Sequence, residues 1–334
     1  MPIDINKLVT VFGGSGFLGR YVVQALTNQG HRVRVACRRP DLAYHLQTAG
    51  RLGQIQAVQA NLRYRWSIDR AVEGADHVVN LVGILSEAGK QKFTALQAEG
   101  ARDVAEDAKA VGARLTQMSA IGADENSRSR YARTKALGER YVRETVPEAV
   151  ILRPSIVFGA EDQFFNRFAN MARFSPVIPL VGAETRFQPV FVNDVALAVA
   201  AAVDGEVAGG RTYELGGPEV LSFRRLMEEM LLVIDRKRKI LSISEGAAGR
   251  LAGLMEKLPG APITTDQVAQ LQHDNIVSDA AKAEGRTFEA FSIKPRSLEA
   301  ILPTYLVRFR PQGQFTRGSP TSDKTVDDEI APRP

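Results

Sequence analysis

Cysteine and histidine, the side chains from which disulfides and zinc sites are built, are scarce in this chain. Its 334 residues contain one cysteine, Cys37, and four histidines that lie far apart. A single cysteine excludes a disulfide within the chain and is typical of a reducing compartment. Because a zinc site needs several such ligands at close spacing, the sequence predicts no metal site.

Long apolar runs are also missing. The longest uninterrupted one, Val195–Val203, is far shorter than the ~20 residues of a membrane-spanning helix. The first residues include Asp4, Asn6 and Lys7, which interrupt any apolar segment there. We therefore expect neither a transmembrane helix nor a signal peptide.

The charge balance is mildly basic, with a formal net charge of +5 and a pI of about 9.3. No nucleic-acid-binding motif accompanies this charge, so we predict no nucleic-acid partner. The charge instead suits an anionic cofactor or an acidic surface, whether of lipid or of protein. Since 44% of the residues are hydrophobic, the chain can form one large domain or two unequal ones.

The first half alternates short apolar runs with helical patterns. This alternation predicts an α/β fold of the Rossmann type, a doubly wound parallel sheet with helices on both faces. The predicted strands are Leu8–Phe12, Arg32–Ala36, Ile55–Gln59, His77–Leu81, Arg114–Met118 and Ala149–Leu152. The predicted helices are Phe17–Asn28, Leu42–Ala49, Ser67–Val72, Phe93–Val111 and Tyr131–Thr145.

Beyond Arg153 the pattern changes, because prolines divide the chain into shorter segments. We assign residues 1–155 to the Rossmann domain and expect a later segment, about 186–217, to complete its sheet. Residues 156–310 are assigned to a smaller C-terminal domain that resembles a substrate domain. Residues 311–334 are rich in Pro, Gly, Ser, Thr and charge, which predicts a disordered tail.

A glycine-rich turn separates the first predicted strand from the first predicted helix. A tight turn needs a residue without Cβ, because a positive φ costs glycine almost nothing. The N–H groups that begin the helix, beside the positive end of its dipole, then suit a pyrophosphate. In this place the G-x-x-G-x-x-G spacing predicts a dinucleotide site. The predicted contacts of this turn are Gly13, Gly14, Ser15, Gly16, Phe17, Leu18 and Gly19.

Two arginines, Arg38 and Arg39, follow the second predicted strand. A site selective for NAD usually carries a carboxylate there for the ribose 2′-hydroxyl, whereas a guanidinium suits a 2′-phosphate. The sequence therefore predicts NADPH, the alternative being an ordinary solvated pair of charges. Asp41 lies past Pro40, at the start of the next predicted helix, and receives less weight.

Tyr131 and Lys135 lie four residues apart, on one face of a predicted helix. An ammonium beside a phenol favours the phenolate, so we expect a lowered pKa for Tyr131. The tyrosine then exchanges a proton with a carbonyl or alcohol oxygen during hydride transfer, and the lysine hydrogen-bonds the nicotinamide ribose. Ser119, after the fifth predicted strand, is expected to hold the substrate oxygen. The predicted catalytic residues are Ser119, Tyr131 and Lys135.

The glycine turn, the serine and the Y-x-x-x-K pair together resemble the short-chain dehydrogenase/reductase superfamily. Ile151–Gly159 and Phe191–Val195 resemble its extended and atypical branch, which includes epimerases and dehydratases, and the resemblance covers about residues 7–240. Asn61 stands where the family usually has an aspartate near the adenine. The resemblance implies further cofactor contacts from Tyr131, Lys135, Asn61, Leu62, Val82, Gly83 and Pro154.

A narrower resemblance runs through Ser129–Glu139, Val146–Ala149, Phe158–Phe168 and Gln188–Val192. These segments are similar to the NADPH-binding accessory subunits of respiratory complex I from mitochondria and alphaproteobacteria. The resemblance implies a tightly held NADPH that does not turn over, with other complex I subunits as partners. It also implies a peripheral position on the cytoplasmic side of the inner membrane, near the quinone-binding region.

The sequence leaves two functions open. The first is the structural or regulatory role of such an accessory subunit. The second is a free NAD(P)H-dependent oxidoreductase, epimerase or dehydratase. In the second, Tyr131 is the proton donor, Lys135 its electrostatic partner and Ser119 polarises the carbonyl.

Two segments of the C-terminal half also have alternative interpretations. Phe158–Arg186, which has the features of a long loop, carries phenylalanines that either pack a small core or form a pocket or docking surface. The basic cluster Arg236–Lys239 is either a contact for anionic lipid or an acidic partner, or a solvated helix end. An apolar helical pattern follows it, made of Ala247, Leu251, Leu254, Met255 and Leu258.

Overall fold

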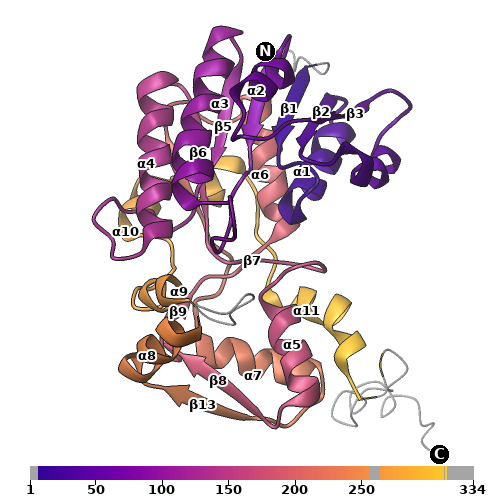
Figure 1. The fold of residues 1–334 in the computed structure, drawn as a ribbon. Coiled ribbons are helices and arrows are strands. Elements are labelled where there is room, and N and C mark those ends of the chain that lie inside the picture. The colour runs from indigo at the N-terminus through magenta and orange to yellow at the C-terminus, as the bar shows by residue number, and fades with distance from the viewer. Residues whose placement is uncertain (1–6, 256–263, 312, 314–334) are drawn as a thin grey trace, which may run out of the picture.

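The computed structural model describes residues 7–255, 264–311 and 313, and its centre is a seven-stranded sheet (Figure 1). The strand order is β11-β6-β5-β4-β1-β2-β3, and all neighbouring strands are parallel. The predicted doubly wound parallel sheet is therefore confirmed. Its strands are β1 (Leu8–Phe12), β2 (Arg32–Cys37), β3 (Ile55–Gln59), β4 (His77–Asn80), β5 (Arg114–Met118), β6 (Val150–Pro154) and β11 (Thr212–Leu215).

Helices cover both faces of the sheet, each face over its own apolar core. Successive strand residues point to opposite faces, so Val78 of β4 belongs to one core and Val79 to the other. Both valines are fully buried. The helices over the Val79 face are α1 (Phe17–Asn28) and α6 (Val192–Asp204), and those over the Val78 face are α2 (Arg65–Val72), α3 (Glu99–Ala110) and α4 (Arg130–Thr145).

Two of the predicted helices differ in the structure. In place of an α-helix over Leu42–Ala49, the chain forms the 3-10 turns Pro40–Leu42 and Tyr44–Ala49. One residue of these turns is buried, so they lack the apolar stripe that stabilises a surface α-helix. The helix predicted over Phe93–Val111 begins with a π-helical turn, Thr94–Ala98, before α3.

A second, smaller core lies at the lower end of the molecule in Figure 1, around the fully buried Phe158 and Phe165. Its strands pair two by two: β7 (Val157–Phe158) with β10 (Val190–Phe191), β8 (Val177–Val181) with β13 (Lys239–Ile243), and β9 (Arg186–Phe187) with β12 (Leu221–Ser222). Its helices are α5 (Phe165–Phe174), α7 (Phe223–Val233), α8 (Glu245–Met255), α9 (Thr265–Gln270) and α11 (Leu298–Leu306).

The segment 158–186 is not the long loop that the sequence suggests, because it contains α5 and β8. Phe164 and Phe168 pack against the second core that Phe158 and Phe165 form. Phe174, at the end of α5, is instead 78% exposed. Core packing therefore accounts for four of these rings and leaves Phe174 on the surface.

The chain returns to the sheet after α9. Helix α10 (Asp279–Ala283) leads to a 3-10 turn, Phe288–Phe291, whose two phenylalanines are buried in the core beneath α1 and α6. The ring of Phe291 lies 5.0 Å from that of Tyr213 in β11. A segment from the region assigned to the smaller domain thus packs against the first core.

Among the helices that the structure describes, none is long and apolar enough to cross a membrane. The apolar pattern predicted after the basic cluster corresponds to α8, in which Ala248 and Ala252 are buried against Val181 and Val268. Leu258 of that pattern lies outside the described residues, as does the predicted tail 311–334 apart from Pro311 and Gly313.

Candidate cofactor and active site

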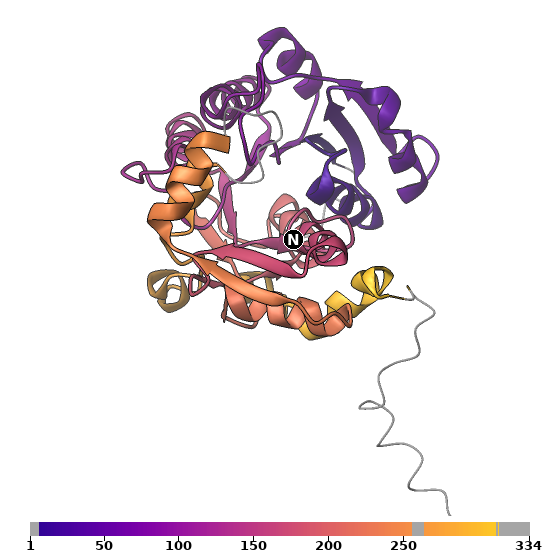
Figure 2. The same ribbon diagram turned by 60° about the horizontal axis from the view of Figure 1, so that its bottom comes forward.

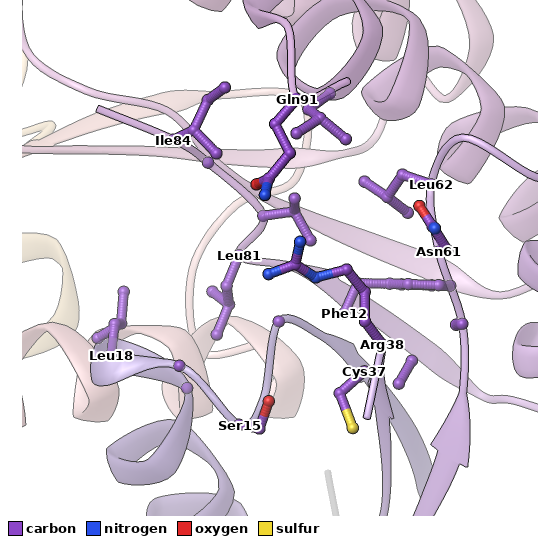
Figure 3. A pocket seen from close by; sticks show the side chains of 18 of the residues that line it. Phe12, Ser15, Leu18, Cys37, Arg38, Asn61, Leu62, Leu81, Ile84 and Gln91 are labelled. Carbon is purple, nitrogen blue, oxygen red and sulfur yellow. The ribbon is translucent and has the colours of Figure 1, made fainter. Parts of the chain in front are cut away.

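A crevice of about 300 Å³ opens between the carboxyl ends of β1 and β4 (Figure 3). The sheet order reverses at this point, since β2 and β3 continue on one side and β5, β6 and β11 on the other. The connections that follow β1 and β4 therefore lead away from each other and leave a gap. Doubly wound folds bind their ligands at such a gap.

The glycine turn forms one wall of the crevice. Gly13 has a φ of +79°, which a residue with a side chain adopts at a cost. A Cβ on Gly19 would lie 2.6 Å from Cα of Gly14 and closer still to the carbonyl oxygen of Gly13. The first glycine thus permits the turn, and the last lets α1 start directly against it.

The start of α1 is suited to an anion. Its N-cap is Gly16, which has no side chain to occupy the free N–H groups, and its first turn contains no acidic residue. These N–H groups and the positive end of the helix dipole face the crevice that Gly13, Ser15 and Gly16 line. The residues present therefore fit the pyrophosphate of a dinucleotide.

The two predicted arginines have different environments. Arg38 lines the crevice, and Figure 3 shows its guanidinium reaching across the opening toward Gln91. Its neighbour Arg39 is turned to Asp41, with Nη2 donating over 2.6 Å and Nε over 2.9 Å to the carboxylate. Within the part of the chain that the structure describes, Arg38 has no carboxylate partner, so its charge is available to a ligand.

The remaining predicted cofactor contacts divide into two groups. Asn61, Leu62, Val82 and Gly83 line the crevice together with Phe17, Leu18 and Gly19. Gly14 supports the turn from behind, where its Cβ would meet Val35 at 3.0 Å. Pro154, at the end of β6, does not line the crevice, and its carbonyl accepts from the N–H of Ile121 over 3.0 Å.

Several lining residues were not predicted from the sequence. Phe12, Ala36 and Leu81 are the last residues of predicted strands, and Cys37 follows one of them, so extending the predicted contacts back to the strand ends would have found all four. Ile84 and Gln91 come from the segment between β4 and the predicted helix, where no local pattern marks them. Leu96 lies in the π-helical turn with which that helix begins.

Tyr131 and Lys135 stand between the crevice and a second cavity. The Nζ of Lys135 donates to the carbonyl of Met118 over 3.3 Å. The same Nζ lies close to the crevice, since a Cβ on Gly83 would be 3.2 Å from it. Tyr131, one turn earlier on α4, lines the second cavity. Its ring meets that of Phe93 edge to face, with centroids 5.9 Å apart. The pair therefore connects the two openings.

The lowered pKa expected for Tyr131 is wrong for the protein without cofactor. Burial, and secondly the carboxylate of Asp266, raise the pKa of Tyr131 to about 12. Burial also lowers the pKa of Lys135 to about 8, although Glu139 opposes this effect. Desolvation disfavours the charged form of each group. The phenol is thus a proton donor in this state, and the lysine is still mostly charged at neutral pH.

Ser119 is bonded away from the tyrosine. Its hydroxyl donates to Oε1 of Glu139 over 2.5 Å, and both groups are buried. Glu139 also accepts two hydrogen bonds from Arg153, from Nε and Nη2, each over 2.7 Å. The serine is therefore part of a buried ionic network that joins β5, α4 and β6.

Asp266 of α9 fixes the start of the helix that carries Tyr131. Its carboxylate accepts from the backbone N–H of Arg130 over 2.5 Å and from the Ser129 hydroxyl over 3.0 Å. A carboxylate at a helix N-terminus is stabilising, because it satisfies free N–H groups and complements the dipole. The second core is thereby tied to the active-site helix.

The second opening, which we term the interdomain cavity, has a volume of about 530 Å³. It extends from Tyr131 and Ile121 on the sheet side to Phe164, Phe223 and Met171 of the second core. The fold thus offers a nucleotide-sized crevice and a separate cavity, joined at a tyrosine and a lysine. This is the arrangement that carbonyl chemistry beside a dinucleotide requires.

Comparison with known proteins agrees with this architecture. The chain is 34% identical over 338 residues to the mitochondrial NADH dehydrogenase (ubiquinone) 1 alpha subcomplex subunit 9 of Arabidopsis thaliana, covering 97% of this chain and 81% of that protein. It is 30% identical over 298 residues to the ceramide reductase of Caulobacter vibrioides, covering 85% and 90%.

Among solved structures, the NADPH-dependent quinone oxidoreductase QOR2 from Escherichia coli, complexed with NADPH, superposes with a TM-score of 0.69. It shares 19% identity and covers 87% of this chain and 97% of that one, a likeness of fold. Residues 9–216 match the model of the NAD dependent epimerase/dehydratase family. The chain therefore belongs to the NAD dependent epimerase/dehydratase family and is a homologue of the alpha subcomplex subunit 9 proteins of NADH dehydrogenase.

Proposed function

We propose that the protein is an NADPH-binding accessory subunit of respiratory complex I, with a structural or regulatory role near the junction with the membrane. The observation that carries the proposal is the 34% identity to the Arabidopsis subunit along 97% of this chain. A likeness of that extent includes the second core as well as the sheet. It therefore covers both the nucleotide crevice and the elements that would contact partner subunits.

Affinity purification of the tagged chain from detergent-solubilised membranes of its source tests this assignment. We expect the other complex I subunits to be recovered with it in comparable amounts. Recovery of the chain alone, as a free monomer or dimer, would contradict the role of subunit. That result would not contradict the nucleotide site, which cofactor titration tests separately.

NADPH is favoured over NADH by Arg38, whose guanidinium lies in the crevice without a carboxylate partner among the described residues. A 2′-phosphate offers oxygens for a forked, charge-assisted pair. Arg39 is already paired with Asp41, so it contributes less to this selectivity. We infer that Lys135, which lies near Gly83 beside the crevice, would hydrogen-bond the nicotinamide ribose.

Arg38→Glu is expected to weaken NADPH binding about 10- to 100-fold, the value of a hydrogen-bonded charge of ~1.5–3 kcal/mol. NADH binding should change far less, since NADH lacks the phosphate. Titration of cofactor fluorescence on the purified protein measures both affinities. Arg39→Glu is the matched control, with the same change of charge one residue away. Equal losses in the two variants would contradict the assignment.

A second candidate function is reduction of a carbonyl compound, favoured by the protonated Tyr131 between the crevice and the interdomain cavity. NADPH, when bound, supplies the hydride for such chemistry. Tyr131 donates its phenolic proton to the carbonyl oxygen, and Lys135 stabilises the phenolate that this leaves. The Caulobacter relative, which is 30% identical to this chain, is named a ceramide reductase, and this name supports the candidate. Ready release of NADPH and its oxidation by carbonyl compounds would favour this candidate.

A peripheral position on the cytoplasmic face of the inner membrane is part of the proposal. The surface that supports it, which we term the basic apolar face, combines the exposed Phe174, Leu232 and Leu241 with the basic cluster Arg236–Lys239. These residues lie on α5, α7 and β13 or between α7 and β13, at the end of the molecule that Figure 2 turns forward. Arg236 and Arg238 donate to the carbonyls of Phe309 and Ala172, and neither forms an ion pair with a carboxylate of the described residues, although Glu228 and Asp235 line the same surface. Cations beside exposed apolar side chains suit anionic lipid.

The variant Lys237→Glu/Lys239→Glu is expected to bind phosphatidylglycerol vesicles at least 30-fold more weakly, since each lysine near an anionic surface contributes ~1 kcal/mol. Sedimentation with vesicles at low salt measures the partition. The control Lys90→Glu/Lys109→Glu makes the same change of net charge at two exposed lysines of the sheet domain. Equal loss in both variants would mean that net charge, and not this face, determines binding.

A further inference from the structure

The interdomain cavity has one aromatic wall and one aliphatic wall. The rings of Phe164 and Phe223 stack at 5.5 Å, and Phe168 and Phe187 meet Phe223 edge to face at 5.5 and 5.7 Å. Met171 of α5 also lines the cavity. The facing aliphatic side chains include Pro179, Val181, Ile243 and Leu271. A volume of about 530 Å³ between such walls is that of a small-molecule site and not of a packing defect.

Most polar side chains that line this cavity are already bonded within the protein. Asn275 accepts from the Ser155 hydroxyl over 2.7 Å and donates to the carbonyl of Ile121 over 3.0 Å. Asp274 pairs with Arg186 over 2.6 Å. A sugar or another polyol would bury hydroxyl groups here without partners, at ~1–3 kcal/mol for each.

The other amides of the lining are engaged in the same way. Gln270 donates to the carboxylate of Asp266 over 3.0 Å, and Gln267 accepts from the backbone of Thr264 over 3.2 Å in a capping box. Ser127, Arg167 and His273 also line the cavity. The amides and Asp274 are thus already bonded within the protein, and the apolar side chains offer the larger free surface.

Tyr131 also lines the cavity, on its sheet side, and is partly buried. Its hydroxyl has no hydrogen-bond partner in the described parts of the chain, and burial raises its pKa, which keeps it protonated. A phenol that faces a cavity in this way can donate to a ligand that supplies an acceptor. The acceptor would lie at the sheet side of the cavity, since Tyr131 belongs to α4.

We propose that the interdomain cavity binds a long-chain carbonyl compound. Its hydrocarbon chain lies between the phenylalanine cluster and the wall of Ile243 and Leu271, and its carbonyl oxygen accepts from the Tyr131 hydroxyl. An oxo-acyl lipid and an isoprenoid quinone share this chemistry. The elements that line the cavity, α5, α7 and β13, also carry Phe174, Leu232 and Leu241 of the basic apolar face.

Calorimetric titration of the full chain without cofactor tests the proposal, with methyl undecyl ketone, decylubiquinone and UDP-glucose as probes. We expect binding of at least one of the two long-chain carbonyl compounds. The probe that binds more tightly indicates whether the ligand is an oxo-acyl lipid or an isoprenoid quinone. UDP-glucose should bind at least tenfold more weakly. Tyr131→Phe should weaken the long-chain probe about three- to tenfold, the value of one neutral hydrogen bond.

Met171→Lys, which places a charge in the cavity, should weaken the long-chain probes at least tenfold. Val220→Lys, at a side chain that is 44% exposed and outside the cavity, should leave their binding unchanged. Ile243→Lys tests the opposite wall if the first variant does not fold. Tighter binding of UDP-glucose, or long-chain binding that survives both cavity variants, overturns the proposal. This inference rests on the proposed function, which assigns the cofactor a place beside Lys135. The titrations contain no NADPH, so the cavity proposal and the cofactor proposal can fail independently.

Discussion

Gly19→Ala is expected to abolish NADPH binding and to destabilise the sheet domain. A Cβ at this position would lie 2.6 Å from both Cα and the carbonyl carbon of Gly14. These are backbone atoms of a turn that Gly13, with its positive φ, already constrains. They cannot move aside as a flexible side chain would, so α1 must shift away from the turn.

A shift of α1 displaces the N–H groups that would hold the pyrophosphate. Losing two charge-assisted hydrogen bonds of ~1.5 kcal/mol each corresponds to at least 100-fold weaker NADPH binding. Overpacking of this kind also lowers the free energy of unfolding by about 1–3 kcal/mol. Cofactor titration and urea denaturation of the purified variant measure the two effects.

Gly249→Ala is the matched control, because it makes the same change inside helix α8. A Cβ there meets no atom of another described residue within 4 Å beyond its own helix backbone. Alanine has the higher helix propensity, so we expect stability to rise by up to ~1 kcal/mol with NADPH affinity unchanged. A Gly19→Ala protein that binds NADPH normally would show that the turn does not hold the cofactor.

The sheet domain was predictable because its signals are local. Each of β1 to β5 is a short apolar run followed by a helical pattern, and the bounds of β1 to β6 agree with the predicted strands to within one or two residues. The strand β8 was missed because Pro179 lies within it. Proline is tolerated at a sheet edge, and β8 pairs with β13 alone among the described strands. Which edge a strand occupies is not visible in its own sequence.

The site was predictable to the extent that single residues decide it. The glycine turn depends on backbone conformation at Gly13 and on the lack of a side chain at Gly19, both local properties. The pKa of Tyr131 is raised first by burial and secondly by Asp266, which lies 135 residues away along the chain. The bond between Ser119 and Glu139 likewise joins a strand end to a helix. Such pairings are decided by tertiary packing and not by spacing.

Glu139→Ala is expected to lower the free energy of unfolding by about 3–5 kcal/mol. The carboxylate is 1% exposed and accepts from Arg153, Arg143 and Ser119. Its removal leaves the guanidinium of Arg153 largely buried, with the carboxylate of Glu214 3.7 Å away as its remaining partner. A buried charge without adequate pairing is the costliest defect that a single substitution creates here.

Urea denaturation measures this loss, and Glu144→Ala is its control on the same helix. Glu144 is 64% exposed and lies 3.8 Å from Arg140, so its removal should cost less than about 0.5 kcal/mol. The double variant Glu139→Met/Arg153→Met removes both charges and should recover most of the lost stability. If the double variant is no more stable than Glu139→Ala, the unpaired arginine is not the cause.

The same double variant separates stability from function. Glu139 supports the charge of Lys135, whose pKa burial lowers to about 8, so without the carboxylate this pKa falls further. A larger fraction of the lysine is then neutral at neutral pH, which weakens its bond to the nicotinamide ribose. We therefore expect the double variant to fold stably yet bind NADPH more weakly at pH 8 than at pH 6. Wild-type protein should show a smaller difference, and an equal difference would confine Glu139 to a structural role.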